Sequence, residues 1–203
     1  MRNNLYRAVI VIALFVCSCR TTPTEQLCSP DIPIEGLRVA DIAFRLGRTI
    51  ESDLIAASGG ESNRYSHVGI IVNCDGKFSV IHIEPNPNDE LDIIKQESLY
   101  DFFRSDRSVA GCVARIESLS PIERNIVQDK ALCLFNSGIT FDHKYALSDS
   151  SSMYCTELVE NVFQSIGISL SQGRTHTLPF VHEPIILPSD IAQNEALNVV
   201  WSY

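Results

Sequence analysis

The chain has 203 residues, of which 45% are hydrophobic and 20% are charged, as is typical of one globular domain and not of a disordered segment. The formal net charge of −9, with no long run of Lys or Arg, argues against nucleic acid as a partner, because phosphate binding needs clustered basic residues. The seven cysteines include no CxxC pair, which argues against a structural zinc ribbon.

Residues 1–18 are expected to be a signal peptide. Two arginines, Arg2 and Arg7, precede an apolar run at residues 8–16 that is too short to cross a bilayer as a helix. The run ends in Cys-Ser-Cys, which resembles a bacterial lipobox with Cys19 as the lipidated residue. Because Arg20 and not aspartate follows, the resemblance implies a lipid anchor in the outer membrane, facing the periplasm. An ordinary secretory signal is the alternative.

Residues 19–36 are rich in Thr, Pro and Glu and are expected to be a tether, followed by a single domain at residues 37–203. Export implies an oxidising compartment, where disulfides can form. The sequence leaves open the pairing among Cys28, Cys74, Cys112 and Cys133.

The apolar patterns predict strands alternating with short helices. Strands are expected at residues 40–46, 67–74, 77–84, 91–94, 108–116 and 198–201. Helices are expected at residues 50–58, 99–104, 121–136 and 155–166. The stretch between residues 140 and 153 is expected to be a loop. Together these elements predict an α+β domain with an antiparallel sheet packed with helices.

The dipeptide Asp75-Gly76, between two β-rich runs, predicts a tight hairpin. A two-residue turn pairs Cys74 with Lys77, and the same register places His67 opposite Glu84, with Cβ atoms about 5 Å apart. A carboxylate beside an imidazole raises its basicity and fixes its orientation, as a catalytic triad requires. A surface ion pair is the alternative interpretation.

The next pair on the same face of the hairpin joins Gly69 to His82, so the glycine leaves space there. The polar residues before His67 indicate that a cleft opens at this end of the strand. If Glu84 acts independently of His67, His82 is the other candidate for the third catalytic position.

The candidate nucleophile is Cys155, which begins an amphipathic helix. The N–H groups and dipole of a helix N-terminus lower the pKa of a thiol placed there. An isolated cysteine is usually a buried apolar residue. The polar residues around Cys155, at positions 150–152 and 156, argue against deep burial and in favour of a reactive thiol.

Three motifs occur in one order along the chain: ADIAFR at residues 40–45, SHVG at 66–69 and YCTELV at 154–159. This series resembles the YaeF/YiiX-like family of permuted papain-like amidases, a branch of the NlpC-type superfamily. The resemblance spans about residues 38–165, and Ala40 departs from it where the family usually has glycine. It implies a circularly permuted papain-like fold with the nucleophilic cysteine at a helix N-terminus.

By this resemblance Cys155 is the nucleophile, His67 the base and Glu84 the third member of the triad, with Tyr154 as a further active-site residue. The implied activity is that of a cysteine amidase or peptidase, which cleaves an amide in an envelope substrate such as a cell-wall peptide through a thioacyl-enzyme. This chemistry needs no cofactor and no metal.

The sequence leaves three other functions open. The same residues suit a lipid-directed acyltransferase or thioesterase that acts on a lipid-linked amide or ester. The chain could also be a non-enzymatic lipoprotein that binds an envelope ligand. A metal site is the last alternative, built from His67, His82, Glu84 and Cys155.

Overall fold

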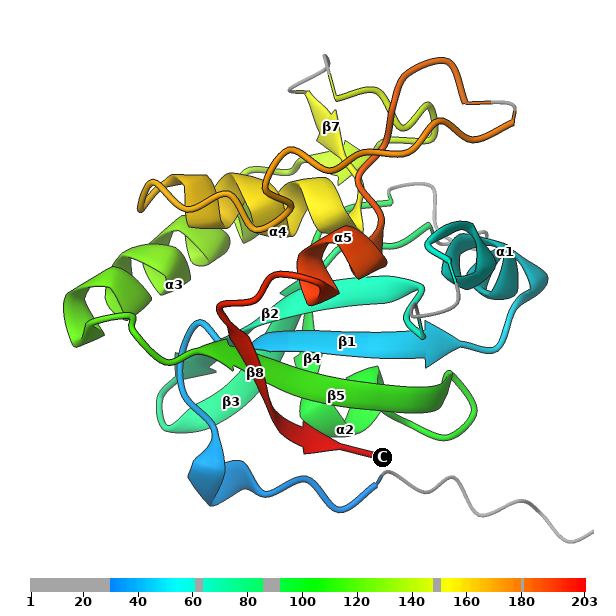
Figure 1. Cartoon of the computed structure of the whole chain (residues 1–203). Helices are drawn as coiled ribbons and strands as arrows, with labels where there is room; N and C mark the ends of the chain where they lie inside the picture. Colours follow the sequence, from blue (N-terminus) through cyan, green and yellow to red (C-terminus); the bar gives the residue numbers. More distant parts are fainter. Residues whose placement is uncertain (1–29, 61–63, 86–91, 148–150, 180) are drawn as a thin grey trace, which may run out of the picture.

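The computed structural model describes residues 30–60, 64–85, 92–147, 151–179 and 181–203. Within this part of the chain one antiparallel sheet has six strands, in the order β4-β3-β2-β1-β5-β8 (Figure 1). Its strands are β1 (Ile42–Gly47), β2 (His67–Cys74), β3 (Lys77–His82), β4 (Lys95–Ser98), β5 (Ser108–Ile116) and β8 (Leu197–Ser202). The predicted α+β class is confirmed.

Helices cover both faces of the sheet (Figure 1). One face packs against α3 (Pro121–Phe135), α4 (Cys155–Gln164) and α5 (Pro188–Ala192), and the other against α2 (Leu99–Phe102). Helix α1 (Ile50–Ser58) lies at one end of the sheet, the end towards which the start of α4 points. The remaining short elements are η1 (Ile34–Gly36) and the parallel pair β6 (Thr140–Phe141) and β7 (Ser152–Met153).

Two apolar clusters follow from this arrangement. On the α4 face, Val68 and Ile70 of β2 pack in one cluster with Leu158 and Val162, which repeat at helical spacing along α4. On the α2 face, Ile71 of β2 packs in a second cluster with α2 residues. Because both faces are covered, β2 is a nearly continuous apolar run instead of an alternating one.

The β2–β3 hairpin has the predicted register, from Cys74 opposite Lys77 to Ile70 opposite Ile81. The turn residues Asp75 and Gly76 have φ angles of 53° and 80°, the left-handed conformations that a type I′ turn requires. The two strands of the hairpin therefore carry their side chains on the predicted faces.

Several predicted elements differ from the structure. The strand expected at residues 91–94 is wrong for the described residues 92–94, where Ile93 forms an isolated bridge to Thr140, and β4 begins after it at Lys95. The second hairpin strand ends at His82 and not at Glu84. The expected loop at residues 140–153 contains β6 and β7. Helix α5 was not predicted, because five residues are too few to show a helical period.

The predicted signal peptide, Cys19 and the first part of the tether lie outside the described residues. The last part of the expected tether packs on the domain, since Trp201 Nε1 donates to the carbonyl of Asp31 at 3.0 Å and Arg115 Nη2 to that of Gly36 at 2.6 Å. The folded body thus begins before Leu37. In the described part of the chain, no helix has the length and apolar character needed to cross a membrane.

Gly69 is a position where the packing of β2 on β3 requires glycine. A Cβ atom there would lie 2.9 Å from the Cβ of His82 and 2.5 Å from a methyl carbon of Val80. We therefore expect Gly69→Ala to lower the free energy of unfolding by about 1–3 kcal/mol, the usual cost of overpacking a core, as measured by urea denaturation. Gly36→Ala is the control, because its Cβ would meet nothing within 4 Å. Equal stability of the two variants would contradict this account of the packing.

Candidate active site

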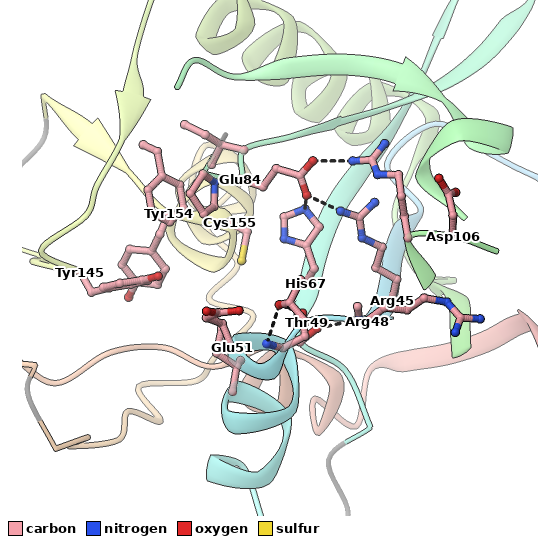
Figure 2. Close-up of a pocket in the computed structure, with 18 residues that line it drawn as sticks. Arg45, Arg48, Thr49, Glu51, His67, Glu84, Asp106, Tyr145, Tyr154 and Cys155 are labelled. Carbon is pink, nitrogen blue, oxygen red and sulfur yellow. Dashed lines mark hydrogen bonds and ion pairs between the residues drawn. The ribbon is translucent and has the colours of Figure 1, made fainter. Parts of the chain in front are cut away.

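A cavity of about 340 Å³ opens at the end of the sheet where β1 and β2 meet α1 and the start of α4. All four predicted site residues, Cys155, His67, Glu84 and Tyr154, line this cavity (Figure 2). The structure therefore brings His67, of the motif at 66–69, together with Cys155, of the motif at 154–159. These two residues are 88 positions apart in the sequence.

Cys155 is the first residue of α4. Tyr154, the residue before it, is the N-cap of this helix and has an extended backbone. Its side chain is half-buried at the wall of the cavity. The sulfur lies beside the backbone N–H groups of Val68 and Thr156. Because Val68 directly follows His67 in β2, this contact brings the thiol to the base. Figure 2 shows the His67 ring between Glu84 and the Cys155 sulfur.

Burial raises the pKa of the Cys155 thiol to about 11, although the N–H groups of Val68 and Thr156 and the charge of Arg45 act to lower it. The N–H groups near the helix start lower the thiol pKa, as expected, but the loss of hydration on burial raises it by more. The sequence-based expectation of a lowered thiol pKa is therefore wrong. At neutral pH, Cys155 rests as a thiol.

His67 is 8% exposed and begins β2. Burial and the neighbouring charge of Arg45 hold its pKa well below the ordinary value of 6.5. The imidazole is thus neutral at neutral pH and has one ring nitrogen free of a proton. A neutral imidazole beside a neutral thiol is a pair in which the base is ready to accept the thiol proton.

The hydrogen-bond partner of His67 is His82, because the His67 Nε2 atom lies 2.8 Å from His82 Nδ1. The Oε2 atom of Glu84, the predicted partner, is 4.0 Å from the same nitrogen. Glu84 is a neighbour of His67, as the hairpin register predicted. However, β3 ends at His82, and the Glu84 carboxylate beyond it binds Arg45 and Arg107 instead of the imidazole.

Three cations surround the Glu84 carboxylate. Arg45 and Arg107 each bind one of its oxygens, and Lys95 Nζ lies 3.7 Å away. Burial acts to raise the pKa of Glu84, but the combined charges of its neighbours, including Arg45 and Arg107, outweigh that effect and lower it. Glu84 is consequently ionised at the mouth of the cavity.

Arg45 was part of the first motif but was not predicted to be a site residue. It is 4% exposed, donates from Nη1 to the Phe102 carbonyl at 2.9 Å, and stacks 4.6 Å from the centre of the Phe102 ring. A charged residue in the middle of an apolar strand was the signal that could have identified it, since a buried charge must be paired.

Two tyrosines form the wall opposite the arginines. The Tyr154 hydroxyl accepts a hydrogen bond from the Ile186 N–H at 3.0 Å, and its ring centre lies 5.4 Å from that of Tyr145. Tyr145, which was not predicted, is held in a turn by the Asp142 carboxylate. Burial, together with the charge that Cys155 can carry, raises the pKa of Tyr145 to about 12, so its hydroxyl stays protonated on the wall of the cavity that Cys155 also lines.

The sequence matches no protein-family model and no curated protein. Among solved structures, the fold is similar to that of the metalloprotein yiiX from Escherichia coli O157:H7, with a TM-score of 0.65 and 19% sequence identity, over 82% of this chain and 97% of that chain. The chain has a YiiX-like fold. The YiiX-like resemblance and the α+β class with an antiparallel sheet packed against helices are thereby confirmed, and at this identity the likeness concerns the fold alone.

A thiol with a pKa of about 11 should be alkylated through its small thiolate fraction. We expect the rate at which iodoacetamide labels Cys155 to rise about tenfold per pH unit between pH 7 and 10, followed by mass spectrometry of the peptide that contains Cys155. A plateau below pH 8 would instead reveal a preformed thiolate–imidazolium pair. Repeating the profile in His67→Ala is the control, because the rise should remain when the imidazole is removed.

Proposed function

We propose that this protein is a papain-like cysteine hydrolase of circularly permuted type, an amidase or peptidase with Cys155 as nucleophile and His67 as base. The observation that carries the proposal is the placement of the Cys155 sulfur beside the Val68 N–H, next to a buried neutral imidazole, in an open cavity. A nucleophile and its base within reach of each other, with the base oriented by a third group, is the signature of covalent catalysis.

The proposed reaction begins when the Cys155 S–H bond breaks and the proton moves to His67 as sulfur attacks the substrate carbonyl carbon. His67 then gives this proton to the leaving amine nitrogen as the C–N bond breaks, which leaves a thioester on Cys155. In the second half, His67 takes a proton from water, hydroxide attacks the thioester, and the C–S bond breaks. The sulfur takes the proton back, and a free carboxylic acid leaves.

The negative oxygen formed during the attack needs hydrogen-bond donors. The first turn of α4 offers N–H groups, because Tyr154 at the N-cap makes no side-chain hydrogen bond to that turn. The Tyr145 hydroxyl on the cavity wall is a further donor. Preorganised donors of this kind are commonly the largest single contribution to acyl-transfer catalysis.

Glu84 is the third member of the proposed triad, and it acts through charge. Its carboxylate, 4.0 Å from His67 Nε2, favours the imidazolium that forms when His67 takes the thiol proton. The contacts of Glu84 with Arg45 and Arg107 keep this carboxylate ionised and in place.

The proposed substrate is an amide of the cell envelope, such as a cell-wall peptide, reached from a membrane anchor at Cys19. The cavity also has an apolar side, formed by Ile55, Ile83 and Phe141. That side suits an acyl chain, so a lipid-linked amide or ester, with an acyltransferase or thioesterase reaction at the same residues, is the alternative substrate class.

A metal site is the second candidate function. The ligand atoms of His67, His82 and Glu84 lie within 4.8 Å of one another, and the structurally similar yiiX is a metalloprotein. These residues fit a cation poorly, however. The two imidazoles are hydrogen-bonded to each other at 2.8 Å, and Arg45 and Arg107 already bind the carboxylate and would repel a metal ion. We therefore assign no catalytic step to a metal.

The hydrolase proposal predicts that Cys155→Ala abolishes product formation when cell-wall fragments and envelope lipids are incubated with the protein and followed by mass spectrometry. Peptides with a new carboxylate and amine would identify an amidase, and released or transferred fatty acid would identify the lipid-directed alternative. His67→Ala should reduce the rate by roughly 10²–10⁴, the usual contribution of a general base.

Cys133→Ala is the matched control for this experiment, because Cys133 is an exposed thiol on α3 and should be dispensable. A chelator should leave the activity unchanged. Activity that survives in Cys155→Ala, or that disappears with the chelator, would refute the thiol mechanism and favour the metal site.

The proposed anchor predicts that Cys19→Ala releases the protein from the membrane fraction, as measured by immunoblotting of fractionated cells. A single thioether-linked cysteine carries the lipid in a lipoprotein, so Cys17→Ala is the control and should leave the protein at the membrane. Membrane association that persists in Cys19→Ala would argue for another means of attachment.

A further inference from the structure

Six charged side chains line the cavity that contains the Cys155 thiol. They are three guanidinium groups and three carboxylates: Arg45, Arg48, Arg107, Glu51, Glu84 and Asp106. Most of these charges are matched within the protein. Arg45 and Arg107 bind the two oxygens of Glu84. Arg104, from outside the cavity, binds both oxygens of Asp106, at 2.7 and 3.1 Å. Four of the six charges therefore already have a partner of opposite sign.

Arg48 and Glu51 are the two charges that this pairing leaves over. In the described part of the chain, neither of them forms an ion pair. Both are exposed, and they stand on either side of Thr49, the N-cap of α1, which accepts a hydrogen bond from the Ser52 N–H. Helix α1 has no buried residue, so it forms the rim of the cavity and is not part of the core. The rim thus presents two unmatched charges to whatever enters.

These two charges face different sides of the cavity mouth (Figure 2). The Arg48 side chain extends towards Asp106, and its Nε atom donates to the carbonyl of Ser105. That bond orients the guanidinium group and uses only one of its five N–H donors. Glu51 points to the side of Tyr145, and its charge contributes to the raised pKa of the Tyr145 hydroxyl. Glu51 is itself ionised, because its own backbone N–H lowers its pKa. The mouth is therefore positive on one side and negative on the other.

We propose that Glu51 and Arg48 are specificity-determining residues that select a short zwitterionic peptide, with Glu51 binding its ammonium group and Arg48 its carboxylate. This inference rests on the proposed hydrolase function and narrows its substrate class. A free ammonium group and a free carboxylate on one small molecule are features of a released peptide fragment. An intact cell-wall polymer or a lipid-linked amide does not offer both ends together.

The rest of the rim also suits a peptide. Besides Arg48 and Glu51, this stretch contributes the hydroxyl groups of Thr49 and Ser52 and the apolar side chain of Ile55 to the cavity wall. A peptide main chain alternates polar amides with carbon atoms, so it matches a wall of this mixed character. An extended tripeptide spans about 10 Å, so its two charged ends can meet groups on separate sides of the mouth.

Protection of Cys155 from iodoacetamide measures occupation of the cavity without any need for turnover. The probe is triglycine at neutral pH, where it carries both charges. N-acetyltriglycine lacks the ammonium group, and triglycine amide lacks the carboxylate. We expect triglycine to protect the thiol at a concentration about three- to fivefold lower than either analogue, the range of an exposed ion pair. In about 1 M salt the three compounds should become nearly equal, because the charges are screened.

Two variants separate the two charges. In Glu51→Gln, triglycine and N-acetyltriglycine should protect equally, because the ammonium group has lost its partner, while triglycine amide stays weaker. In Arg48→Gln, triglycine and triglycine amide should protect equally, while the N-acetyl analogue stays weaker. The matched controls are Asp53→Asn, in the same first turn of α1, and Arg38→Gln. Both control residues are exposed and do not line the cavity, so these variants should behave as wild type.

Absence of protection by triglycine, or equal protection by all three compounds in the wild type, would overturn the inference. Glycerophosphoethanolamine is the arm that represents a lipid headgroup, since it carries an ammonium group beside a phosphate. Better protection by this compound than by triglycine would overturn the assignment to a peptide. Charge-dependent protection by triglycine together with full activity in Cys155→Ala would refute the thiol mechanism and leave the binding inference standing, so the two failures are distinguishable.

Discussion

The contact between the imidazoles of His67 and His82 is the constraint on which the rest of the site depends. Two buried imidazoles whose nitrogens, His67 Nε2 and His82 Nδ1, lie 2.8 Å apart cannot both carry a positive charge, so at least one of them is neutral in the folded protein. This contact requires β2 and β3 to approach closely, and the approach is possible because Gly69 has no side chain. A backbone feature of the hairpin thus decides the protonation of the base at the cavity.

The charges around the two histidines are paired with one another. Arg45, Arg107 and Lys95 lie against Glu84, and Arg107 also binds Glu97. Removing charged groups from water is costly unless each one finds a partner, and here each carboxylate has a cation beside it. Burial and the same cations lower the pKa of His67, so the site holds ionised carboxylates near a neutral imidazole.

Residues in regular apolar elements and in the tight hairpin turn were predictable from the sequence, whereas residues on a polar edge strand or in an irregular segment were not. The hairpin register follows from the Asp75-Gly76 turn, and it correctly brought Glu84 and His82 near His67. Glu97 was missed because β4 is an edge strand of polar residues, which has none of the apolar alternation that identifies a strand. Tyr145 was missed because it belongs to an irregular segment whose turn depends on hydrogen bonds to Asp142.

The protonated state of Cys155 has a consequence for chemical durability. Peroxides and disulfides react with thiolates, so oxidation of a cysteine to sulfenic acid or to a mixed disulfide follows its ionised fraction. With a pKa of about 11, only about one Cys155 in 10⁴ is ionised at pH 7. In the proposed reaction the Cys155 thiolate forms only as sulfur attacks a carbonyl, so the resting thiol would resist oxidation in the oxidising compartment that the predicted export implies.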